Sequence, residues 1–377
     1  MKITIAPDSF KGSLSARQAS DIIRNAITDQ LYQVETSLIP MSDGGEGMLD
    51  SLIETLNGQK IELTCHGPLG NKIKTYYGGI DKKTAIIETA KICGLTLVPV
   101  NKRNPENTTT FGVGEVIIDA IDRGFERIII GIGGSATNDG GYGMLNALGL
   151  KGFDKKGNQL SYYGADLYNL AYLDWLKLDK RLENVDIIVA NDVNNILCGE
   201  SGASFIYGKQ KGATQQQIKQ LDQALFNFAK KVEKLKVVNL KYELGSGAAG
   251  GLGYGLLIIG AKLIPGAKLI ADAVELESEI ASTNLVITGE GKSDEQTLNG
   301  KVPIYLSKLA KKYNKPIILI SGSVDNNNFE LTNSFTSVFS IINEPMSIDN
   351  AMKNAEELLY NQMSQVIKLI TYYNLDD

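Results

Sequence analysis

Short apolar strands alternate with amphipathic helices at both ends of this chain, and this alternation constrains the fold most. Residues 2–7 have a strand pattern, and residues 15–28 have a helical pattern with isoleucines on one face. The same order returns near the other end, where a strand pattern over 284–291 precedes a helical pattern over 302–313. A β-α-β-α order is typical of a parallel sheet. The two ends therefore predict one discontinuous Rossmann-like or flavodoxin-like domain.

The middle of the chain has a different pattern. Residues 61–80 and 83–90 contain short strand patterns between turn residues, which is typical of antiparallel pairing. A helical pattern over 111–124 and a buried strand pattern over 127–134 follow. The 377 residues also exceed the usual size of one domain. We therefore expect an α/β fold of two domains, a discontinuous one formed by 1–60 and 280–377 and a second α/β domain, 61–279, inserted into it.

Charge and composition argue against several classes of protein. The formal net charge is −5, and the sequence lacks the basic run that nucleic-acid binding needs. The three cysteines are far apart and odd in number, which disfavours a disulfide framework and favours a reducing compartment such as the cytoplasm. The first apolar run breaks at Asp8, too early for a signal peptide, and no transmembrane helix is expected.

A single histidine restricts the catalytic chemistry. His66 follows a short strand pattern and is expected in an exposed turn. Hydrolysis by Ser-His-Asp or Cys-His pairs and polyhistidine zinc sites are therefore disfavoured. If the active site needs a proton acceptor, a carboxylate is the default.

Carboxylates follow the ends of predicted strands along the whole chain. They are Asp8, Asp43, Glu46, Asp139, Asp192, Glu290 and Asp294. Ligands of parallel sheets bind at the carboxyl ends of strands, and acids gathered there repel one another unless a cation is present. Mg²⁺ carried on nucleotide phosphates is such a cation. The alternative is that each Asp only caps a helix or begins a turn, as Asp often does.

A glycine-rich loop over 131–141 follows one predicted strand and precedes a helix. Glycines allow several backbone N–H groups to face one anion, and a helix N-terminus adds partial positive charge. The loop has the letters GIGGSATNDGG and is not a Walker A motif. A second glycine-rich segment, 245–255, contains GxGxxG with Asp272 further on, which by itself suggests a dinucleotide site. Close helix packing or a second part of the active site is the preferred interpretation there.

Long blocks of the sequence resemble the signature blocks of the bacterial type-1 glycerate kinases. Among them are PMSDGGEG at 40–47, GIGGSATNDGGYGML at 131–145 and TGEGKSDEQTLNGKVP at 288–303. Further blocks at 6–16, 103–115, 191–195 and 245–256 extend the resemblance over almost the whole chain. The resemblance implies ATP-dependent phosphorylation of D-glycerate to 2-phosphoglycerate with Mg²⁺, by two α/β domains with the site between them. 3-Phosphoglycerate stays open as the alternative product.

The residues expected at the site divide by role. Asp192 is the preferred base because it follows a buried strand pattern among asparagines, and Asp294 is the alternative. Lys11 joins these two as a catalytic candidate. Ser13, Arg103, Ser135 and Asn138 are expected to bind glycerate; Gly133, Gly134, Thr137, Gly140, Gly141 and Glu290 to bind ATP; and Asp43, Glu46 and Asp139 to bind Mg²⁺.

These residues come from both predicted domains, so we expect them to meet in a cleft between the two. Two rival hypotheses stay open at this point. One is an NAD(P)-dependent oxidoreductase, which rests on GxGxxG, and the other is a non-catalytic sugar-acid sensor. The expected partners are small molecules, with neither nucleic acid nor membrane among them, and a homo-oligomer is left open.

Overall fold

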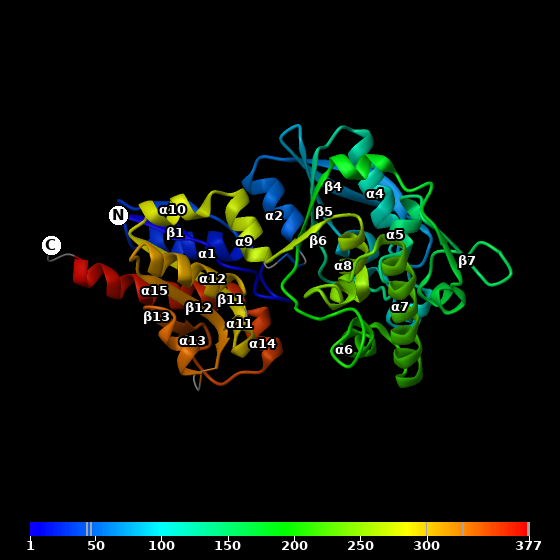
Figure 1. Cartoon of the computed structure of the whole chain (residues 1–377). Helices are drawn as coiled ribbons and strands as arrows, with labels where there is room; N and C mark the ends of the chain where they lie inside the picture. The colour runs from blue at the N-terminus through cyan, green and yellow to red at the C-terminus, as the bar shows by residue number, and fades with distance from the viewer. Residues whose placement is uncertain (43, 46, 299, 326–327, 375–377) are drawn as a thin grey trace. The chain divides into compact units, whose positions relative to one another are not determined.

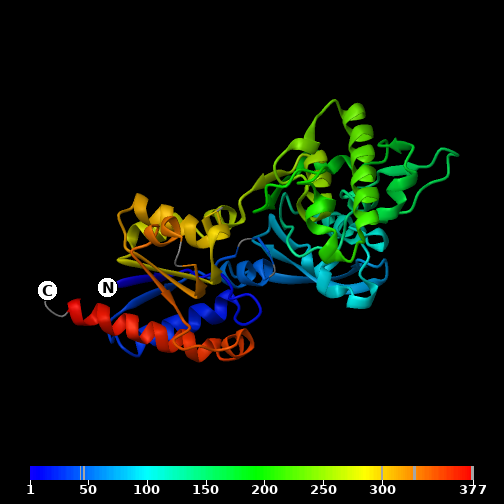
Figure 2. The same cartoon turned by 90° about the horizontal axis from the view of Figure 1, so that it is seen from below.

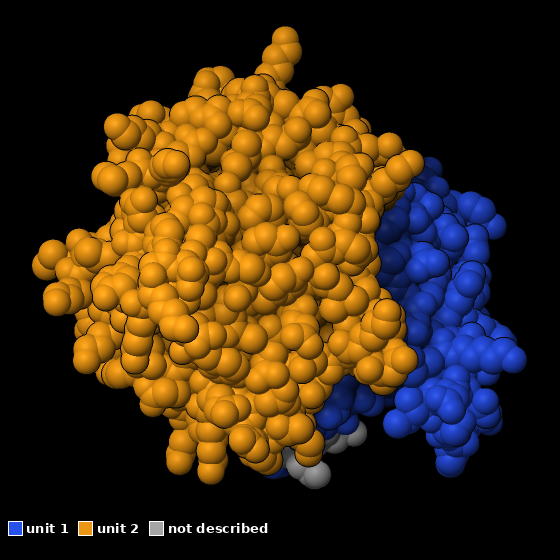
Figure 3. Space-filling model, turned by 90° about the vertical axis from the view of Figure 1, so that its right-hand side faces the viewer, with its two compact units in different colours: residues 1–43, 265–377 blue, residues 44–264 orange. Residues whose placement is uncertain are grey.

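The computed structural model describes residues 1–42, 44–45, 47–298, 300–325 and 328–374. The chain divides into two compact units, shown in Figures 1 and 3. Unit 1 comprises residues 1–43 and 265–377, and unit 2 comprises residues 44–264.

The predicted boundaries, after residues 60 and 279, differ from those of the two units. Helix α2 (Met48–Thr55) contacts β4 (Lys72–Ile80) and β5 (Thr84–Glu88), which places it in unit 2. Helix α9 (Gly266–Ala273) contacts α10 (Leu276–Ser282), and both lie in unit 1. The boundaries therefore depend on which sheet each flanking helix covers.

Unit 1 is built on one parallel sheet in the order β13-β12-β11-β1-β2. Its strands are β1 (Lys2–Ile5), β2 (Glu35–Leu38), β11 (Leu285–Ser293), β12 (Ile317–Val324) and β13 (Ser337–Ser340). Besides α9 and α10, its helices are α1 (Ala16–Thr28), α11 (Glu295–Leu298), α12 (Val302–Lys312), α13 (Phe329–Asn333), α14 (Ile348–Lys353) and α15 (Ala355–Asn374). In Figure 2, α1 and α15 cover one face and α9, α10 and α12 the other. The prediction of an α/β fold with a parallel sheet is confirmed.

The strand order of unit 1 has a functional consequence. Counted along the chain within this unit, the order is 2-1-3-4-5, as in flavodoxin-like sheets. The chain reverses its direction of winding between β1 and β11, which pair in parallel with Ile5 beside Ile287. Ligands of such sheets bind outside the carboxyl ends of the two strands at this switch point. The core beneath it is aliphatic and includes Ile3, Ile23 and Ile320.

Unit 2 contains a six-stranded sheet in the order β10-β9-β6-β5-β4-β3. Strands β3 (Gln59–His66), β4 and β5 pair antiparallel, as predicted, whereas β5, β6 (Arg127–Gly131), β9 (Asp186–Ala190) and β10 (Lys262–Ile264) pair in parallel. A separate two-stranded antiparallel sheet pairs β7 (Lys151–Phe153) with β8 (Tyr172–Asp174). Besides α2, its helices are α3 (Ala90–Cys93), α4 (Phe111–Asp122), α5 (Tyr142–Ala147), α6 (Ala203–Tyr207), α7 (Gln215–Lys236) and α8 (Ala248–Ile258). Short 3-10 helices span Leu95–Leu97, Val100–Lys102, Pro105–Asn107, Gly164–Asn169, Lys180–Asn184, Lys209–Lys211 and Leu240–Tyr242.

Among the described residues, no helix is both long and apolar enough to cross a membrane. His66 was expected in an exposed turn, but it is the last residue of β3 and is partly buried. Its Nδ1 lies 2.9 Å from Glu115 Oε1, and Lys72 Nζ contacts the same carboxylate oxygen. The histidine therefore belongs to a local hydrogen-bond network on the sheet.

Candidate functional site

At the switch point of unit 1, the loop after β1 lies against the second half of β11. The N–H of Asp8 donates to the carbonyl oxygen of Gly289 at 2.8 Å. A Cβ added to Gly291 would lie 3.1 Å from the backbone nitrogen of Lys11, so glycine permits this close approach. Asp8 and Glu290 are only 4% and 5% exposed. Two buried carboxylates thus border the switch point, Asp8 from the loop after β1 and Glu290 from within β11.

Glu290 is held by two hydroxyl groups. Its Oε1 accepts hydrogen bonds from Ser293 Oγ at 2.9 Å and from Thr297 Oγ1 at 2.6 Å. Burial raises the pKa of Glu290 above its ordinary value, although the two hydroxyl donors oppose this rise. The side chain is therefore fixed in one position at the carboxyl edge of the sheet.

Asp294, the alternative base, has a different environment. Lys292 Nζ lies 2.9 Å from its Oδ2, and the N–H of Gln296 donates to Oδ1 at 2.9 Å. The hydrogen bond from Lys292 lowers the pKa of Asp294 below its ordinary value. A carboxylate with a lowered pKa is a weaker proton acceptor, so this geometry favours Asp192 over Asp294 as the base.

The predicted anion anchors of unit 1 differ in suitability. Lys11 is exposed and lies in the turn between β1 and α1. Ser13 Oγ donates its hydrogen to the carbonyl oxygen of Phe10 at 2.9 Å. Because Ser13 already donates its hydroxyl hydrogen in this conformation, it cannot donate that hydrogen to an anion. Of these two residues, Lys11 alone fits the expectation.

In unit 2, glycines bring the residue 44–45 segment against the ends of β6 and β9. A Cβ on Gly44 would lie 2.7 Å from Ala190 Cβ, and a Cβ on Gly133 would lie 2.9 Å from Gly45 Cα. Real Cβ atoms almost never approach other atoms this closely, so larger residues would push the segment away. Asp43 and Glu46, predicted as Mg²⁺ ligands, lie outside the described residues.

Asp139 was expected to bind Mg²⁺, but its hydrogen bonds indicate another role. The side chain is fully buried. Its Oδ2 accepts from the N–H and the hydroxyl of Thr110 at 2.9 and 2.7 Å and from the N–H of Gly143 at 3.2 Å, and its Oδ1 accepts from the N–H of Gly141 at 3.1 Å. Burial raises the pKa of Asp139, although these donors oppose the rise. With both oxygens occupied, the carboxylate holds the loop in place and does not suit a metal.

Further side chains hold the loop before Asp139 in place by hydrogen bonds. Asn138 Nδ2 donates to Ser204 Oγ at 2.8 Å, and Thr137 Oγ1 donates to the carbonyl oxygen of Ala249 at 3.5 Å. Ser135 Oγ accepts a hydrogen bond of 3.0 Å from Lys211 Nζ. Thr137 and Asn138 are fully buried, which fits a structural role better than the predicted contacts with ATP and glycerate. Ser135 lies at the start of the same loop, after Gly133 and Gly134.

The GxGxxG segment packs against this loop. The N–H of Gly140 donates to the carbonyl oxygen of Gly250 at 3.0 Å, and a Cβ on Gly255 would lie 2.8 Å from Gly141 Cα. Helix α8 is interrupted by left-handed backbone from Ala249 to Gly251. These glycines serve close packing between two backbone segments, as preferred from the sequence, and they include the predicted ATP contacts Gly140 and Gly141.

Asp192 follows β9 and is half-buried. Asn191 Nδ2 donates to the carbonyl oxygen of Val193 at 2.7 Å, which shapes the turn on which Asp192 lies. Arg103 is also half-buried, and its Nε is buried without a hydrogen-bond partner in the described part of the chain. Both predicted residues therefore remain suited to a ligand.

Two further residues of unit 2 hold these segments, although the sequence did not single them out. Glu88 ends β5, and its Oε2 accepts from the N–H groups of Gly47 at 3.2 Å and Leu49 at 3.0 Å. Lys211 is buried beneath the loop that contains Ser135. Neither had a motif around it: Glu88 follows an apolar run, and Lys211 is one of several lysines in a polar stretch.

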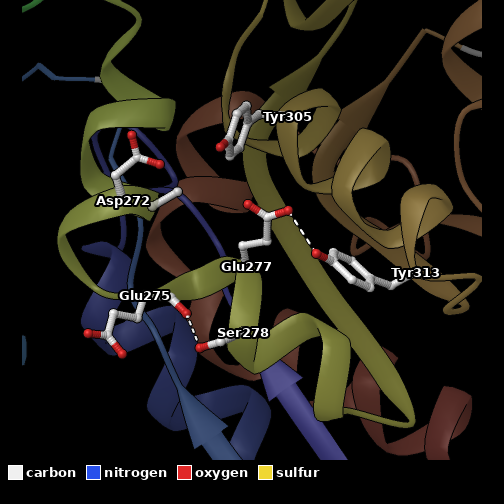
Figure 4. A pocket seen from close by; sticks show the side chains of 7 residues that line it. Asp272, Glu275, Glu277, Ser278, Tyr305 and Tyr313 are labelled. Carbon is white, nitrogen blue, oxygen red and sulfur yellow. Dashed lines mark hydrogen bonds between the residues drawn. The ribbon is translucent and has the colours of Figure 1, made fainter.

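A surface pocket of about 440 Å³ lies elsewhere in unit 1, beside α9, α10 and α12 (Figure 4). None of the residues that line it is a predicted site residue. One of them is Asp272, which follows the GxGxxG segment in the sequence. Asp272 pairs with Lys268 at 2.8 Å, and Glu277 pairs with Lys312 and accepts from Tyr313. Among the described residues, no group of three or more His, Cys, Asp or Glu could hold a metal ion. We therefore assign no role to this pocket.

Comparison with known proteins decides the family. The profile of the glycerate kinase family matches residues 3–371. The chain belongs to the glycerate kinase family. The glycerate kinase from Haemophilus influenzae is 42% identical over 99% of each chain, and the glycerate 2-kinase from Escherichia coli is 43% identical over 94% of each. Membership confirms the expected family and the prediction of a phosphotransferase with an alcohol group as acceptor.

A solved structure agrees with this membership. A crystal structure from Salmonella typhimurium LT2 that carries the provisional name glycerate kinase 2 matches with a TM-score of 0.87. It is 41% identical in sequence, and 99% of each chain is covered. The glycerate kinase fold thus extends over the whole chain, and the oxidoreductase hypothesis loses its only support because GxGxxG is used for packing.

Proposed function

We propose that this member of the glycerate kinase family transfers a phosphoryl group from ATP to the 2-hydroxyl of D-glycerate, giving 2-phosphoglycerate, with Mg²⁺. The observation that carries the proposal is the pair of buried carboxylates, Asp8 and Glu290, at the switch point of a flavodoxin-like sheet. The name of the Escherichia coli relative, glycerate 2-kinase, supports the 2-hydroxyl over the 3-hydroxyl.

The described residues are compatible with MgATP. Asp8 provides carboxylate oxygens from the loop after β1 and Glu290 provides them from β11, and Mg²⁺ bound to phosphates needs only one or two protein carboxylates. Asp43 and Glu46 stay predicted ligands, whereas Asp139 does not suit this role. When bound, MgATP supplies the phosphoryl group and the positive charge that offsets these acids. Lys11 is suited to an anionic oxygen because it is exposed at the same edge.

The base is assigned to Asp192. A hydroxyl nucleophile has to lose its proton, and a carboxylate close to it can accept that proton. Asp192 is half-buried, and the turn it occupies is shaped by Asn191. Asp294 is less suited because the ion pair with Lys292 lowers its pKa. That the edges of both units serve one reaction stays a prediction.

The test is a coupled assay of ADP release with MgATP and a panel of hydroxy acids, with the product identified by phosphorus NMR. We expect release with D-glycerate, a 2-phosphate ester as product, and loss of release in EDTA. Background release with every acid would refute the proposed function, and a 3-phosphate ester would refute its regiochemistry.

A further inference from the structure

Lys211 has a buried charge that the proposed reaction does not yet explain. It ends the 3-10 helix Lys209–Lys211, and its side chain is 2% exposed. Lysines are rarely buried unless they are paired with an acid. The Nζ of Lys211 instead donates to two neutral acceptors, Ser135 Oγ at 3.0 Å and the carbonyl oxygen of Thr137 at 2.6 Å. Burying an ammonium group costs free energy, and this cost suggests a role for Lys211 beyond packing.

The hydrogen bond from Lys211 determines how Ser135 can act. Because Ser135 Oγ accepts a hydrogen bond from Lys211, the hydroxyl hydrogen of Ser135 points away from Lys211. Within the described residues this hydrogen has no acceptor. The backbone around Ser135 is fixed as well, since the N–H of Leu95 donates to Gly134 and the N–H of Ala136 donates to Cys93, both at 2.8 Å. Ser135 O–H is therefore a preorganised donor in the loop after β6.

Arg103, a second cationic residue, lies beside the same segment with its backbone and Cβ. A Cβ on Gly212, the residue after Lys211, would lie 2.9 Å from Arg103 Cβ. The Arg103 Nε is buried and lacks an acceptor among the described residues. A buried donor without an acceptor is costly, which suggests that a ligand supplies one.

We propose that Lys211 is a positioning residue for an oxyanion site whose direct donors are Ser135 O–H and the Arg103 guanidinium. Lys211 orients Ser135 and adds a buried positive charge, and the ligand is an anionic oxygen of a substrate. This inference rests on the proposed function, under which that oxygen is either the carboxylate of the hydroxy acid or a phosphate of ATP.

The charge of Lys211 also gives the site a pH dependence. Burial lowers the pKa of Lys211 to about 8, opposed by the Cys93 thiol and the Asp139 carboxylate. The ring of Tyr207 also faces Lys211, with its centroid 6.0 Å from Nζ. As pH rises through about 8, Lys211 loses its charge, and the oxyanion should bind more weakly.

The experiment compares Lys211→Met, Lys211→Arg, Ser135→Ala and a matched control, Lys209→Met, which removes an exposed lysine from the same short helix. The KM for glycerate and for ATP, and kcat, are measured from pH 6.5 to 9.5. We expect Lys211→Met to raise one KM by about 10–100-fold, the usual range for a charge-assisted hydrogen bond, with a smaller change in kcat. Lys211→Arg should recover part of the loss, and Lys209→Met should match the wild type.

Further outcomes separate positioning from folding. Ser135→Ala should raise the same KM as Lys211→Met. In the variant that combines both substitutions the two increases in KM should not add, because both substitutions act through the Ser135 hydroxyl. The wild-type KM should rise above about pH 8, whereas that of Lys211→Met should stay flat. A change in KM for glycerate identifies a carboxylate ligand, and a change in KM for ATP identifies a phosphate.

The inference is overturned if Ser135→Ala changes neither KM and if both wild-type KM values stay constant across the pH range. This test holds even where Lys211→Met fails to fold. Failure of the proposed function looks different, because the wild type itself would then release no ADP with glycerate. In that case the binding of inorganic phosphate, measured by thermal shift for the wild type and Ser135→Ala, decides the oxyanion site alone. Equal shifts in both proteins would refute it.

Discussion

The Oε2 atom of Glu88 accepts a hydrogen bond of 3.0 Å from the backbone N–H of Leu49, across 39 positions of the sequence. Glu88 ends β5, and Leu49 lies in the first turn of α2, so one buried carboxylate joins a strand end to a helix N-terminus. Such N–H groups have no partner within the helix, and a negative charge there is favourable. The second oxygen, Oε1, is buried without a hydrogen-bond partner in the described residues.

This relationship predicts how pH changes stability. Burial raises the pKa of Glu88 above its ordinary value. Between the unfolded pKa of 4.5 and the higher folded pKa, the folded state therefore binds more protons than the unfolded state. The stability that protonated Glu88 contributes is fully present below the unfolded pKa and is lost as pH rises through the folded pKa. Relative to Glu88→Gln, the unfolding free energy of the wild type should fall as pH increases across that window. Urea titrations at several pH values measure it, with Glu62→Gln as the exposed control. A pH-independent difference would contradict the prediction.

Asp192→Asn should lower kcat strongly and leave the KM for ATP nearly unchanged, since a base acts in the transition state. The usual contribution of a general base is about 10²–10⁴-fold. The matched control is Asp186→Asn, at the start of the same strand, which should keep near-normal kcat. If kcat of Asp192→Asn equals that of the wild type, the base is Asp294 or no residue at all.

Asp139→Ala should destabilise the fold, because it leaves buried donors of Thr110, Gly141 and Gly143 without an acceptor. Each stranded donor costs about 1–3 kcal/mol, so we expect a loss on the order of 3 kcal/mol in urea denaturation. The control Asp154→Ala removes an acid from an exposed turn. A normal stability combined with weaker Mg²⁺ dependence would instead restore the predicted metal role.

Gly133→Ala should raise the KM for ATP, because its Cβ would lie 2.9 Å from Gly45 Cα and push two loops apart. Steady-state kinetics with varied ATP measures the effect. Gly157→Ala is the comparison, since it strains an exposed turn with φ of +83° and should leave KM unchanged. An unaltered KM in Gly133→Ala would show that this close approach does not matter for nucleotide binding.

Local patterns were enough to predict the parallel and antiparallel strands, because the period of apolar residues is a property of neighbouring positions. They also located Asp8 after a strand, since the end of a strand pattern is visible in the sequence, whereas Glu290, expected after a strand, lies within β11, which continues to Ser293. The resemblance to glycerate kinases was visible as well, because its blocks are contiguous segments.

The sequence by itself therefore determined the α/β class, the family and the strand-end acids, while tertiary structure decided what each side chain does. Asp139 has the same local setting as a metal ligand, but Thr110, 29 positions away, occupies its carboxylate. Lys209 and Lys211 are chemically identical residues on one short helix, and only packing against the loop at Ser135 buries the second. Burial and hydrogen-bond partners depend on residues distant in the chain, so no local pattern could predict them.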